Sequence, residues 1–485
     1  MSVAAIPSLS GTPKPRKSLM PWIFDTVEYY PHQIDGIREL AKWKSALLAD
    51  DMGLGKSLQA MTVFAVDVVR GWAEKCIVIC PVTLKGNWED ELLKFTTFPH
   101  VVLSGGPAAR NKQILEFAQM EGPRFLIVNY EQVAPHLDAL NALKFDMKIC
   151  DEGHYVKNYK SKRTKACLSL RTRRTFILTG TPMLNHVNEL WSILHMIDPN
   201  GFPKYWSFVN RYCVFGGFKD KQIIGTKNEK ELKERLHGIM LRRLKKDVLS
   251  LPEVQIIERR VDLLPEQRKL YDEVVNEMRL TTVDDSDPQD IENALTKFLR
   301  LKQICGTTFP FTGVDISSKL DLAIEDDLQL LENEERIVVF TQFRGVQECY
   351  VNRAKKEGVT VWQINGDVKQ PDRMPVVRQW SNSEPGVIVC MLQIAREGLN
   401  LVAARHGSFI DELFVPGLNR QAIDRLHRIG QDESQPVQIR KYICRNTIEN
   451  RIQQILRTKS KLFGEIVESD TNWKRKLYRA MMEDD

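Results

Sequence analysis

Residues Ala49 to Ser57 read ADDMGLGKS; they overlap the end of the apolar run Ala46 to Ala49 and precede a helical pattern that starts near Leu58. A strand, a glycine-containing loop and a helix in this order form a cradle for phosphate groups. Glycine lets the backbone come close to the phosphates, so that backbone N–H groups and the helix N-terminus face the anion. The stretch therefore predicts a nucleotide site in an α/β domain.

The side chains that end this loop suit a nucleoside triphosphate bound with Mg²⁺. Lys56 can reach the outer phosphates, and the Ser57 hydroxyl can bind Mg²⁺. The strict form of the pattern has glycine at the position occupied here by Asp50. Taken alone, the loop therefore fits a nucleotide site and an ordinary turn equally well.

A carboxylate pair supplies a partner for this loop. Asp151 and Glu152, in the sequence DEGH, directly follow the apolar run Phe145 to Cys150. At a strand end, Asp151 can hold Mg²⁺ and Glu152 can orient or deprotonate the attacking water. An isolated acidic pair is more often a solvated turn, but its place after a strand, downstream of the loop, favours the catalytic interpretation.

The sequence LTGTPMLN, Leu178 to Asn185, follows the next predicted strand. Its small hydroxyl residues can connect the γ-phosphate region to a strand-binding surface through hydrogen bonds. A simple proline-containing turn fits the composition equally well. Only the order of the motifs along the chain favours a functional role.

Short β-rich apolar runs recur in two series, and helical patterns separate them. Such runs are typical of parallel strands that are buried on both faces of a sheet. We therefore predict an α/β protein with two doubly wound parallel-sheet lobes and helical insertions. The runs are Cys76–Cys80, Phe125–Asn129, Met147–Asp151 and Thr175–Leu178 in the first series, and Arg336–Thr341, Val359–Ile364, Val387–Leu392, Phe409–Leu413 and Val437–Ile443 in the second.

Changes in composition along the chain indicate where the lobes begin and end. Between them the strand signal fades, and Ile291–Ile304 and Leu320–Leu331 carry amphipathic helix patterns. The acidic, turn-rich Val283–Asp290 predicts an exposed loop. The boundaries that we expect are 1–22 for a flexible tail, 23–240 for the first lobe, 241–330 for a linker with helical protrusions, 331–465 for the second lobe and 466–485 for a basic terminal helix or tail.

The overall composition is that of an ordinary globular protein. Of the 485 residues, 43% are hydrophobic and 27% charged, and the net charge of +6 is mild for this length. No apolar run is long enough to cross a bilayer, and no signal peptide pattern opens the chain. We expect a protein inside the cell, cytoplasmic or nucleoid-associated in a bacterium or virus and nuclear in a eukaryote. The nine cysteines lack paired metal spacing, so we expect neither disulfides nor structural zinc.

The second lobe carries a candidate pair of arginine fingers. In QAIDRLHRIGQ, Gln421 to Gln431, Arg425 and Arg428 are separated by one helical turn and can project from one face. A finger supplied to a bound triphosphate neutralises charge in the transition state, which makes hydrolysis conditional on closure of the lobes. For an arbitrary arginine pair, an exposed helix face is the ordinary interpretation.

The complete ordered set of motifs resembles the Swi/Snf family of helicase-like ATPases, in helicase superfamily two, from about residue 23 to residue 465. The segment MLRRLKKDVLSLPEV and the ending HRIGQ distinguish this family from other motors with a DEAH-like box, and an aspartate at position 50 is usual in it. The resemblance implies two RecA-like lobes that use ATP and Mg²⁺. The motifs are PHQIDGI (Pro31–Ile37), DDMGLGKS (Asp50–Ser57), CPVTLKGNW (Cys80–Trp88), DEGH (Asp151–His154), LTGTPMLN (Leu178–Asn185), MLRRLKKDVLSLPEV (Met240–Val254), VVFTQF (Val338–Phe343), GLNL (Gly398–Leu401) and QAIDRLHRIGQ (Gln421–Gln431).

The resemblance also implies roles for single residues. Gln33 would recognise adenine, Asp151 and Glu152 would serve Mg²⁺ and the attacking water, and Arg425 and Arg428 would be the fingers. Lys85, Thr179, Thr181 and Gln342 fall in motifs that line or couple to the nucleic-acid track in this family. The implied nucleotide-binding residues are Gln33, Asp51, Met52, Gly53, Leu54, Gly55, Lys56, Ser57 and Gln431, with Ser57 and Asp151 as metal ligands.

Two segments depart from the family pattern. Family members have a small, glycine-rich segment before GLNL, whereas Gln393–Glu397 reads QIARE here. The coupling of DNA contact to hydrolysis is therefore left open. Phe409–Gly417, FIDELFVPG, lacks the tryptophan and asparagine that usually precede the proline. This segment resembles the fork-remodelling and strand-annealing branch more than the nucleosome remodellers.

Basic clusters offer a surface for a phosphate backbone. They lie at Lys157–Lys165, Arg171–Arg174 and Arg242–Lys246, and in Trp473–Arg479 they alternate with aromatic residues. Phosphate contacts bind without reading sequence, and their affinity falls with salt. A solvated basic face is the ordinary interpretation of any one cluster.

The resemblance implies a translocase on double-stranded DNA, and with the features above we predict a monomeric ATP-dependent motor that moves along duplex DNA without sequence preference and has no membrane partner. One alternative is a strand-separating or strand-annealing helicase, which would need a wedge that the sequence does not reveal. Another is a DNA-binding scaffold with a vestigial motor. The intact Lys56, Glu152 and arginine pair argue against the scaffold, since an inactive motor does not need them.

Overall fold

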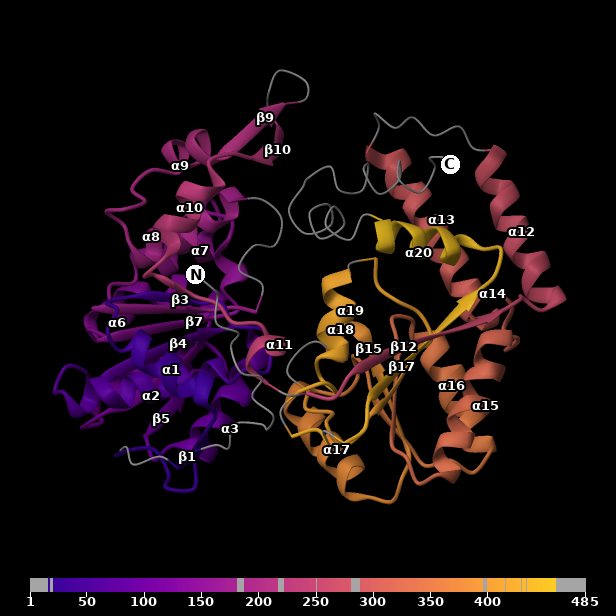
Figure 1. Ribbon diagram of the computed structural model, residues 1–485, viewed down its shortest axis with the longest axis horizontal. Helices are drawn as coiled ribbons and strands as arrows, with labels where there is room; N and C mark the ends of the chain where they lie inside the picture. The colour runs from indigo at the N-terminus through magenta and orange to yellow at the C-terminus, as the bar shows by residue number, and fades with distance from the viewer. Residues whose placement is uncertain are drawn as a thin grey trace, which may run out of the picture. The chain divides into compact units, whose positions relative to one another are not determined.

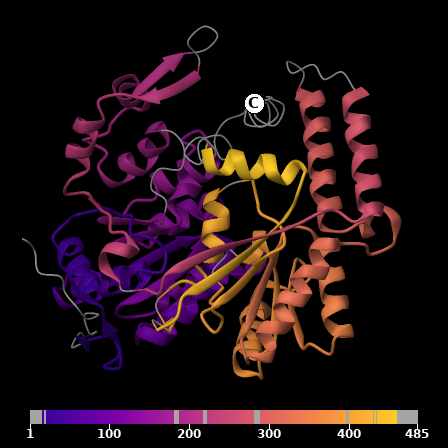
Figure 2. The same cartoon turned by 45° about the vertical axis from the view of Figure 1, so that its right-hand side comes forward.

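The computed structural model divides into two compact units, Met1–Ser250 and Leu251–Asp485 (Figure 1). Each unit contains a sheet of parallel strands with helices packed on both faces, as Figure 2 also shows. The prediction of two doubly wound α/β lobes is therefore confirmed. The residues that the structure describes are 16–17, 21–180, 187–216, 222–249, 251–280, 288–395, 399–414, 416–428, 430–432 and 434–458.

The first unit is organised around a 7-stranded sheet in which every pair of neighbours runs parallel. Its central strands are buried on both faces, which explains their continuous apolar sequences. Four of the predicted strands, with Ala46–Leu48, belong to this sheet, whereas its short edge strands gave no sequence signal. In spatial order the strands are β11 (Met240–Leu241), β3 (Ala46–Leu48), β8 (Arg174–Leu178), β7 (Met147–Asp151), β4 (Lys75–Cys80), β6 (Arg124–Asn129) and β5 (His100–Val102).

Successive side chains of each strand enter two different cores, because they point to opposite faces of the sheet. Leu48 and Val78 pack in one core with Phe64 and Trp88 from helices, whereas Leu47 and Ile77 pack in the other. The first core contains α1 (Pro31–Leu40), α2 (Lys56–Val69) and α3 (Lys85–Phe95). The second contains α4 (Pro107–Gln119), α5 (Tyr130–Val133), α6 (Leu137–Ala142), α7 (Lys162–Ser169) and α8 (Leu190–Ile197).

A smaller apolar cluster packs α8 against α9, β9 and α10 in the first unit. Trp191, Phe208 and Tyr212 are among its buried members. A two-stranded antiparallel sheet of β1 and β2 lies near the N-terminus. The remaining elements of the first unit are β1 (Arg16–Lys17), β2 (Glu28–Tyr29), the 3-10 turns Val82–Leu84, Ala134–His136, Gly153–Val156 and Val187–Glu189, α9 (Tyr205–Tyr212), the antiparallel pair β9 (Cys213–Gly216) and β10 (Gln222–Thr226), α10 (Glu229–Leu236) and α11 (Lys245–Val248).

The second unit has a 6-stranded sheet that is also parallel throughout. Here the eight-residue edge strand β12 was missed, because half of its residues are polar and all of them are partly or fully exposed. It lies within the segment that we predicted as a linker, so the second unit begins well before residue 331. In spatial order the strands are β12 (Val254–Val261), β17 (Val437–Cys444), β16 (His406–Phe409), β13 (Ile337–Thr341), β15 (Val387–Met391) and β14 (Val361–Ile364).

The fourth strand predicted for the second lobe was placed too late in the chain. We expected Phe409–Leu413, whereas β16 ends at Phe409. The polar residues His406 and Ser408 concealed it, because both are buried and Ser408 Oγ donates a hydrogen bond of 2.8 Å to Asp327 Oδ1. A tertiary partner thus makes a polar strand acceptable in the core.

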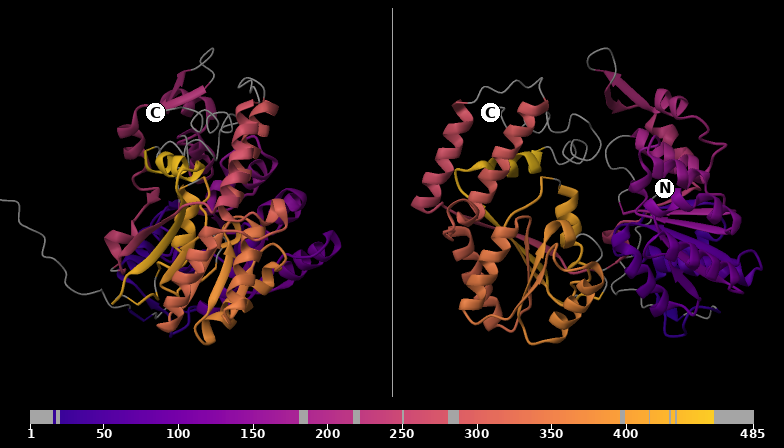
Figure 3. Two further views of the ribbon diagram at one scale, coloured as in Figure 1. Left: turned by 90° about the vertical axis from the view of Figure 1, so that its right-hand side faces the viewer. Right: turned by 180° about the vertical axis from the view of Figure 1, so that it is seen from behind.

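Helices cover both faces of the second sheet, and a further group extends beyond it. Figure 3 shows α12 and α13 side by side, and the amphipathic patterns at Ile291–Ile304 and Leu320–Leu331 fall within α13 and α15 as predicted. Residues 283–287 of the loop predicted at Val283–Asp290 lie outside the described residues. The last three residues of that prediction are wrong, because α13 already begins at Pro288. The helices are α12 (Pro265–Leu280), α13 (Pro288–Gly306), α14 (Phe309–Thr312), α15 (Ser318–Glu332), α16 (Arg344–Lys356), α17 (Gln370–Asn382), α18 (Leu392–Ala395), α19 (Pro416–Ile423) and α20 (Ile448–Thr458).

All nine cysteines are free and buried, where their thiols pack as small apolar groups. In the part of the chain that the structure describes, no helix is both long enough and apolar enough to cross a membrane.

A buried ion pair connects α15 to α20 in the second unit. The Lys319 ammonium, which is 0% exposed, donates hydrogen bonds to both Glu449 oxygens at 2.6 and 2.8 Å and to the Ile410 carbonyl at 2.9 Å. Burial alone lowers the pKa of Lys319, but the Glu449 carboxylate more than offsets this effect, so that the pKa is raised. Lys319 is therefore charged at neutral pH.

We expect Lys319→Ala to destabilise the protein by about 3–5 kcal/mol, because it leaves the buried Glu449 carboxylate without its cation. Urea unfolding followed by circular dichroism measures the change. Lys355→Ala, at an exposed position of α16, is the matched control and should stay within about 0.5 kcal/mol of the parent. Equal unfolding midpoints for the two variants would contradict the assigned role of the pair.

Candidate functional site

Three predicted motifs meet at one edge of the first sheet. Strand β8 pairs in parallel with β3 on one side and with β7 on the other. The carboxyl ends of the three strands therefore lie at the same edge, which is where ligands bind in open α/β sheets. The loop after β3 carries Asp50–Gly55, β7 ends in Asp151 and is followed by Glu152, and β8 leads into Thr179 and Gly180.

The turn after β8 packs directly on the loop after β3. The Thr179 N–H donates to the Leu48 carbonyl over 3.1 Å. A Cβ atom added at Gly180 would lie 2.6 Å from Met52 Cγ, so only glycine fits here without displacing Met52. Thr179 and Gly180 therefore support the shape of the loop.

The loop has the backbone shape of a phosphate cradle. Gly53 and Gly55 have φ values of 85° and 75°, in the left-handed region that residues with a Cβ rarely adopt. Gly55 also faces Gln33, whose Nε2 atom would lie 2.3 Å from a Cβ at position 55. Helix α2 begins at the next residue, Lys56, so its free N–H groups open toward the loop.

The Lys56 ammonium bonds back to the start of this loop. It donates to the carbonyl oxygens of Asp50 and Asp51 over 2.9 and 3.2 Å. A cation, a helix N-terminus and the loop backbone thus converge, which is the combination that attracts a phosphate group. Ser57 follows in the first turn of α2, within reach of the same region.

Asp151 is fixed in place by hydrogen bonds from three directions. The Trp88 indole N–H donates to its Oδ2 over 2.9 Å, the Glu152 N–H donates to its Oδ1 over 2.9 Å, and the Tyr130 hydroxyl donates to its carbonyl over 2.6 Å. Trp88 and Tyr130 had no assigned role in the sequence, although Trp88 closes the motif CPVTLKGNW. Their contribution depends on strand pairing that brings α3 and α5 to the end of β7.

Burial, and then the negative charge of Glu152, raise the pKa of Asp151 to about 7. The positive charge of Lys56 acts in the opposite direction, so the two side chains are close enough to interact. A carboxylate that is costly to ionise by itself is stabilised by a bound cation. Asp151 therefore fits the role of a metal ligand next to the phosphate loop.

Glu152 has a strained backbone and a histidine neighbour. Its φ of 51° is uncommon for a residue with a side chain, and such strain is concentrated at functional sites. His154 Nδ1 lies 3.2 Å from Glu152 Oε2. The strained residue turns the chain sharply at the end of β7, directly into the 3-10 turn that begins at Gly153.

Gln33, the predicted adenine-recognition residue, contacts the phosphate loop. Its Oε1 accepts the Tyr30 N–H over 3.0 Å, and its Nε2 donates to the Leu54 carbonyl over 3.3 Å. The side chain is only 4% exposed. It therefore joins the start of α1 to the loop, and adenine recognition by Gln33 stays a prediction.

The residues predicted to follow the nucleic-acid track are largely buried. The Lys85 ammonium donates to the Leu103 carbonyl, and burial lowers its pKa. Thr179 is 1% exposed, and Thr181 lies outside the described residues. A phosphate contact by Lys85 would require its bond to Leu103 to open, so these contacts stay predictions.

In the second unit, Arg425 and Arg428 do not lie on a helix, which corrects the expectation from their spacing. Helix α19 ends at Ile423, and turns follow it. Long-range contacts hold these turns, since the Leu401 N–H donates to the Arg425 carbonyl and His427 Nε2 lies 2.9 Å from the Pro252 carbonyl. The rest of the segment is also held inside the unit, as Gln431 Nε2 donates to the carbonyls of Ala404 and Leu426.

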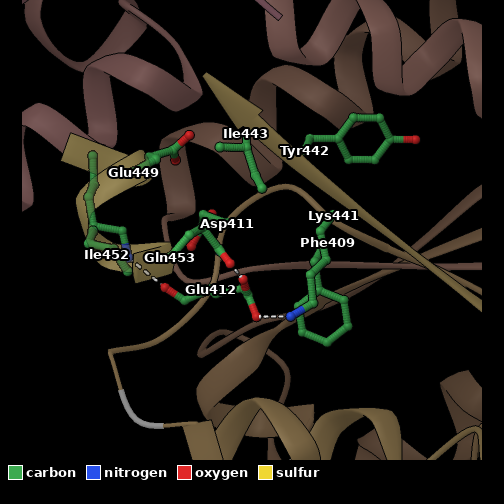
Figure 4. A pocket seen from close by; sticks show the side chains of 10 residues that line it. Phe409, Asp411, Glu412, Lys441, Tyr442, Ile443, Glu449, Ile452 and Gln453 are labelled. Atoms are coloured by element: carbon green, nitrogen blue, oxygen red, sulfur yellow. Dashed lines mark hydrogen bonds and ion pairs between the residues drawn. The ribbon is translucent and has the colours of Figure 1, made fainter. Parts of the chain in front are cut away.

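Gln342 is tied to the segment that departs from the family pattern. Its N–H donates to Asp411 Oδ1 over 3.0 Å, and its Nε2 donates to the Glu412 carbonyl over 3.1 Å. The Glu412 carboxylate accepts hydrogen bonds from Lys441 and Gln453, both at 2.5 Å, as Figure 4 shows. The acidic pair after β16 thus supports the Gln342 turn from within the unit.

Part of the predicted basic surface is structural. Arg174 forms an ion pair with the buried Asp67, and Arg243 forms one with Asp50, which is 0% exposed. In the first cluster, Lys157 lies 3.5 Å from Glu189, and Arg163 lies 3.2 Å from Glu131. The basic segment Trp473–Arg479 lies outside the described residues. The Asp50–Arg243 pair explains the aspartate that replaces glycine in the loop, a role that sequence spacing did not reveal.

Comparison with known proteins gives a consistent family. Residues 28–309 match the SNF2-related domain, and residues 319–430 match the helicase conserved C-terminal domain. The chain is 29% identical over 465 residues to an uncharacterized ATP-dependent helicase of Mycoplasma genitalium, covering 92% of this chain and 44% of the relative. It is 27% identical over 470 residues to the ATP-dependent DNA helicase DDM1 of Arabidopsis thaliana, covering 89% of this chain and 61% of the relative.

Among solved structures, the SWI2/SNF2 ATPase core of Sulfolobus solfataricus in complex with dsDNA aligns with a TM-score of 0.44 and 26% identity, covering 96% of this chain and 99% of that chain. The SNF2-related match covers more than half of the sequence. Three motifs of the first unit, at Asp50–Ser57, Asp151–His154 and Leu178–Gly180, thus meet at one sheet edge, and the chain belongs to the SNF2-related family.

Proposed function

We propose that this chain is an ATP-dependent motor that moves along duplex DNA without reading its sequence. The observation that carries the proposal is the convergence of Lys56, Asp151 and Glu152 at the carboxyl edge of the first sheet. Membership in the SNF2-related family, whose named relatives include ATP-dependent helicases, supports the same activity.

The first unit would bind the nucleotide. Backbone N–H groups of the loop and of the first turn of α2 would face the phosphates, and the Lys56 ammonium would exchange its carbonyl partners for phosphate oxygens. Ser57 and Asp151 would hold Mg²⁺, which neutralises phosphate charge when it is bound. Trp88 would keep the Asp151 carboxylate oriented toward the loop through its 2.9 Å hydrogen bond.

Hydrolysis requires a positioned water and stabilisation of negative charge. Glu152, at the end of β7, would orient the attacking water and accept its proton. Arg425 and Arg428 of the second unit would stabilise the charge that develops on the transferred phosphoryl group. Because the two groups belong to different units, hydrolysis would depend on closure of the units around the nucleotide.

Movement along DNA would follow from alternating affinity. Each nucleotide state would favour a different arrangement of the units, and each arrangement would hold the phosphate backbone at a different register. Phosphate contacts carry no sequence information, which suits a motor that must move over any sequence.

A strand-separating or strand-annealing helicase is the second candidate. The relatives named as helicases favour it. The two candidates differ in the nucleic acid that stimulates ATP hydrolysis, since a translocase on duplex DNA responds to duplex and an unwinding enzyme responds to single strands or forks.

We expect Lys56→Ala and Glu152→Gln to abolish ATP hydrolysis while DNA binding is largely kept. Lys56→Ala removes the cation of the phosphate loop, and Glu152→Gln removes the base that orients water. ATPase activity across duplex, single-stranded and forked DNA measures the loss, with the largest stimulation of the parent by duplex. Lys112→Ala and Glu116→Gln, at exposed positions of α4, are the matched controls.

Two results would argue against this function. Stronger stimulation by single strands would favour the unwinding enzyme, and no hydrolysis with any DNA would favour the scaffold. A triplex-displacement assay then tests movement itself, because an active ATPase that fails to displace the third strand is not translocating.

We expect the affinity for Mg²⁺, in the presence of an ATP analogue, to rise about tenfold between pH 6 and pH 8. The pKa of about 7 means that Asp151 is mostly protonated at pH 6, and metal binding must displace that proton. Mg²⁺ titrations with a fluorescent analogue measure the effect. Asp151→Asn should lose the part of the pH dependence that exceeds titration of the nucleotide itself, and an unchanged profile would contradict the metal role.

We expect Arg425→Ala and Arg428→Ala each to lower kcat by about 10³-fold or more while nucleotide binding is retained, since a finger acts in the transition state. Steady-state ATPase assays with saturating duplex and equilibrium binding of an analogue separate the two effects. Arg420→Ala, at an exposed position of α19, is the control and should keep the parental rate. Loss of binding without loss of kcat would exclude the finger role.

A further inference from the structure

The segment that leads out of the first unit is bonded directly to the phosphate loop. We call residues 240–249 the connector, because the second unit begins at Leu251. Strand β11 pairs with β3, and the ladder continues beyond both strands: the Ala49 N–H donates to the Leu241 carbonyl over 2.7 Å, and the Asp51 N–H donates to the Arg243 carbonyl over 3.0 Å. The Lys245 N–H then donates to Asp51 Oδ2 over 3.0 Å.

Side chains reinforce this ladder. The Arg243 N–H and Nε both donate to Asp50 Oδ1 over 3.0 Å, and Nη2 donates to Asp50 Oδ2. Gln59 Nε2 donates to the same carboxylate over 3.3 Å. Asp50 is 0% exposed, so its charge depends on Arg243 for compensation.

The remaining donors of Arg243 reach the other side of the loop. Nη2 also donates to Gln59 Oε1 over 2.7 Å, and Nη1 donates to the His32 carbonyl. Gln59 and Gln33 both donate to the Leu54 carbonyl at 3.3 Å, and His32 Nε2 lies 3.2 Å from it. The Arg243 guanidinium thus bonds directly to Asp50, the first residue of the loop. It also reaches the Leu54 carbonyl by two separate paths, one through Gln59 and one through His32.

Helix α1 approaches the Arg243 side chain and Gln59 closely at Gly36. A Cβ added at Gly36 would lie 2.0 Å from Gln59 Oε1 and 2.6 Å from Arg243 Nη2. Glycine inside a helix costs about 1 kcal/mol relative to alanine, so its presence at this point needs a packing reason. The space that Gly36 leaves is occupied by the Arg243 network.

We propose that Arg243 is a positioning residue for nucleotide binding, which locks the phosphate loop to the connector so that nucleotide binding and the order of the connector depend on each other. The proposal rests on the proposed ATP binding by the first unit. Coupling between two equilibria is reciprocal: if the connector stabilises the binding-competent loop, the nucleotide stabilises the connector by the same factor. Arg243 touches no reacting atom in this arrangement, because every group on its guanidinium bonds to the protein.

The test compares Arg243→Lys and Asp50→Asn with Arg242→Lys in the full chain. Arg243→Lys keeps the charge and loses the planar fork, whereas Arg242 is an exposed neighbour in the same connector. Equilibrium binding of a non-hydrolysable ATP analogue with Mg²⁺ gives affinity, and amide hydrogen exchange of residues 240–249, with and without the analogue, gives the order of the connector. Exchange in β7 monitors whether the fold is intact.

We expect the analogue to slow exchange in the connector of the parent and of Arg242→Lys. We expect Arg243→Lys and Asp50→Asn to bind the analogue at least tenfold more weakly, and to lose the protection of the connector while β7 stays protected. Parental affinity in Arg243→Lys, or connector exchange that the saturating analogue does not change in the parent, would overturn the proposal.

Failure of the proposed function gives a different result. If the parent does not bind the analogue, ATP binding is refuted, and the proposal is then decided without nucleotide. Faster exchange in both 50–57 and 240–249 of Arg243→Lys, relative to Arg242→Lys, supports the lock between loop and connector. Equal exchange in the two variants overturns it.

Discussion

Parallel pairing of β3, β8 and β7 is the constraint on which the candidate site depends. Each of these strands supplies one functional segment, and parallel alignment brings the three carboxyl ends to a common edge. Nothing in the loop, the acidic box or the TGT turn specifies a position relative to the others. The strand order does so, by placing β8 between the strand of the phosphate loop and the strand of the DEGH box.

Ion pairs compensate buried charges in both units. Asp50 is neutralised by Arg243, Asp67 by Arg174 and, in the second unit, Glu449 by Lys319. Removing one member of such a pair leaves an uncompensated charge in a medium of low dielectric constant, so each pair requires one particular packing arrangement. In the first unit, Arg174 and Arg243 both belong to basic clusters that the sequence offered as a surface for binding nucleic acid.

In the second unit an acidic pair, Asp411 and Glu412, follows β16, as Asp151 and Glu152 stand at the end of β7 in the first unit. Asp411 binds the turn at Gln342, while Glu412 is held by Lys441 and Gln453. These contacts give a physical role to a segment that departs from the family pattern. They also relate that departure to Gln342, since the Gln342 side chain donates to the backbone of the same acidic pair.

Hydrophobic patterning and motif order determined the α/β class, the two parallel sheets, nearly all buried strands and the position of the glycine-containing loop after β3, because these features depend on local sequence. The eight-residue β12, the early position of β16 and the end of α19 before Arg425 escaped prediction, since each depends on partners distant in the chain. The same holds for Trp88 at Asp151 and Arg243 at Asp50. Sequence alone supplied the kinds of functional group, and only the tertiary structure decided which of them share an environment, because burial and hydrogen bonding are properties of neighbours in space.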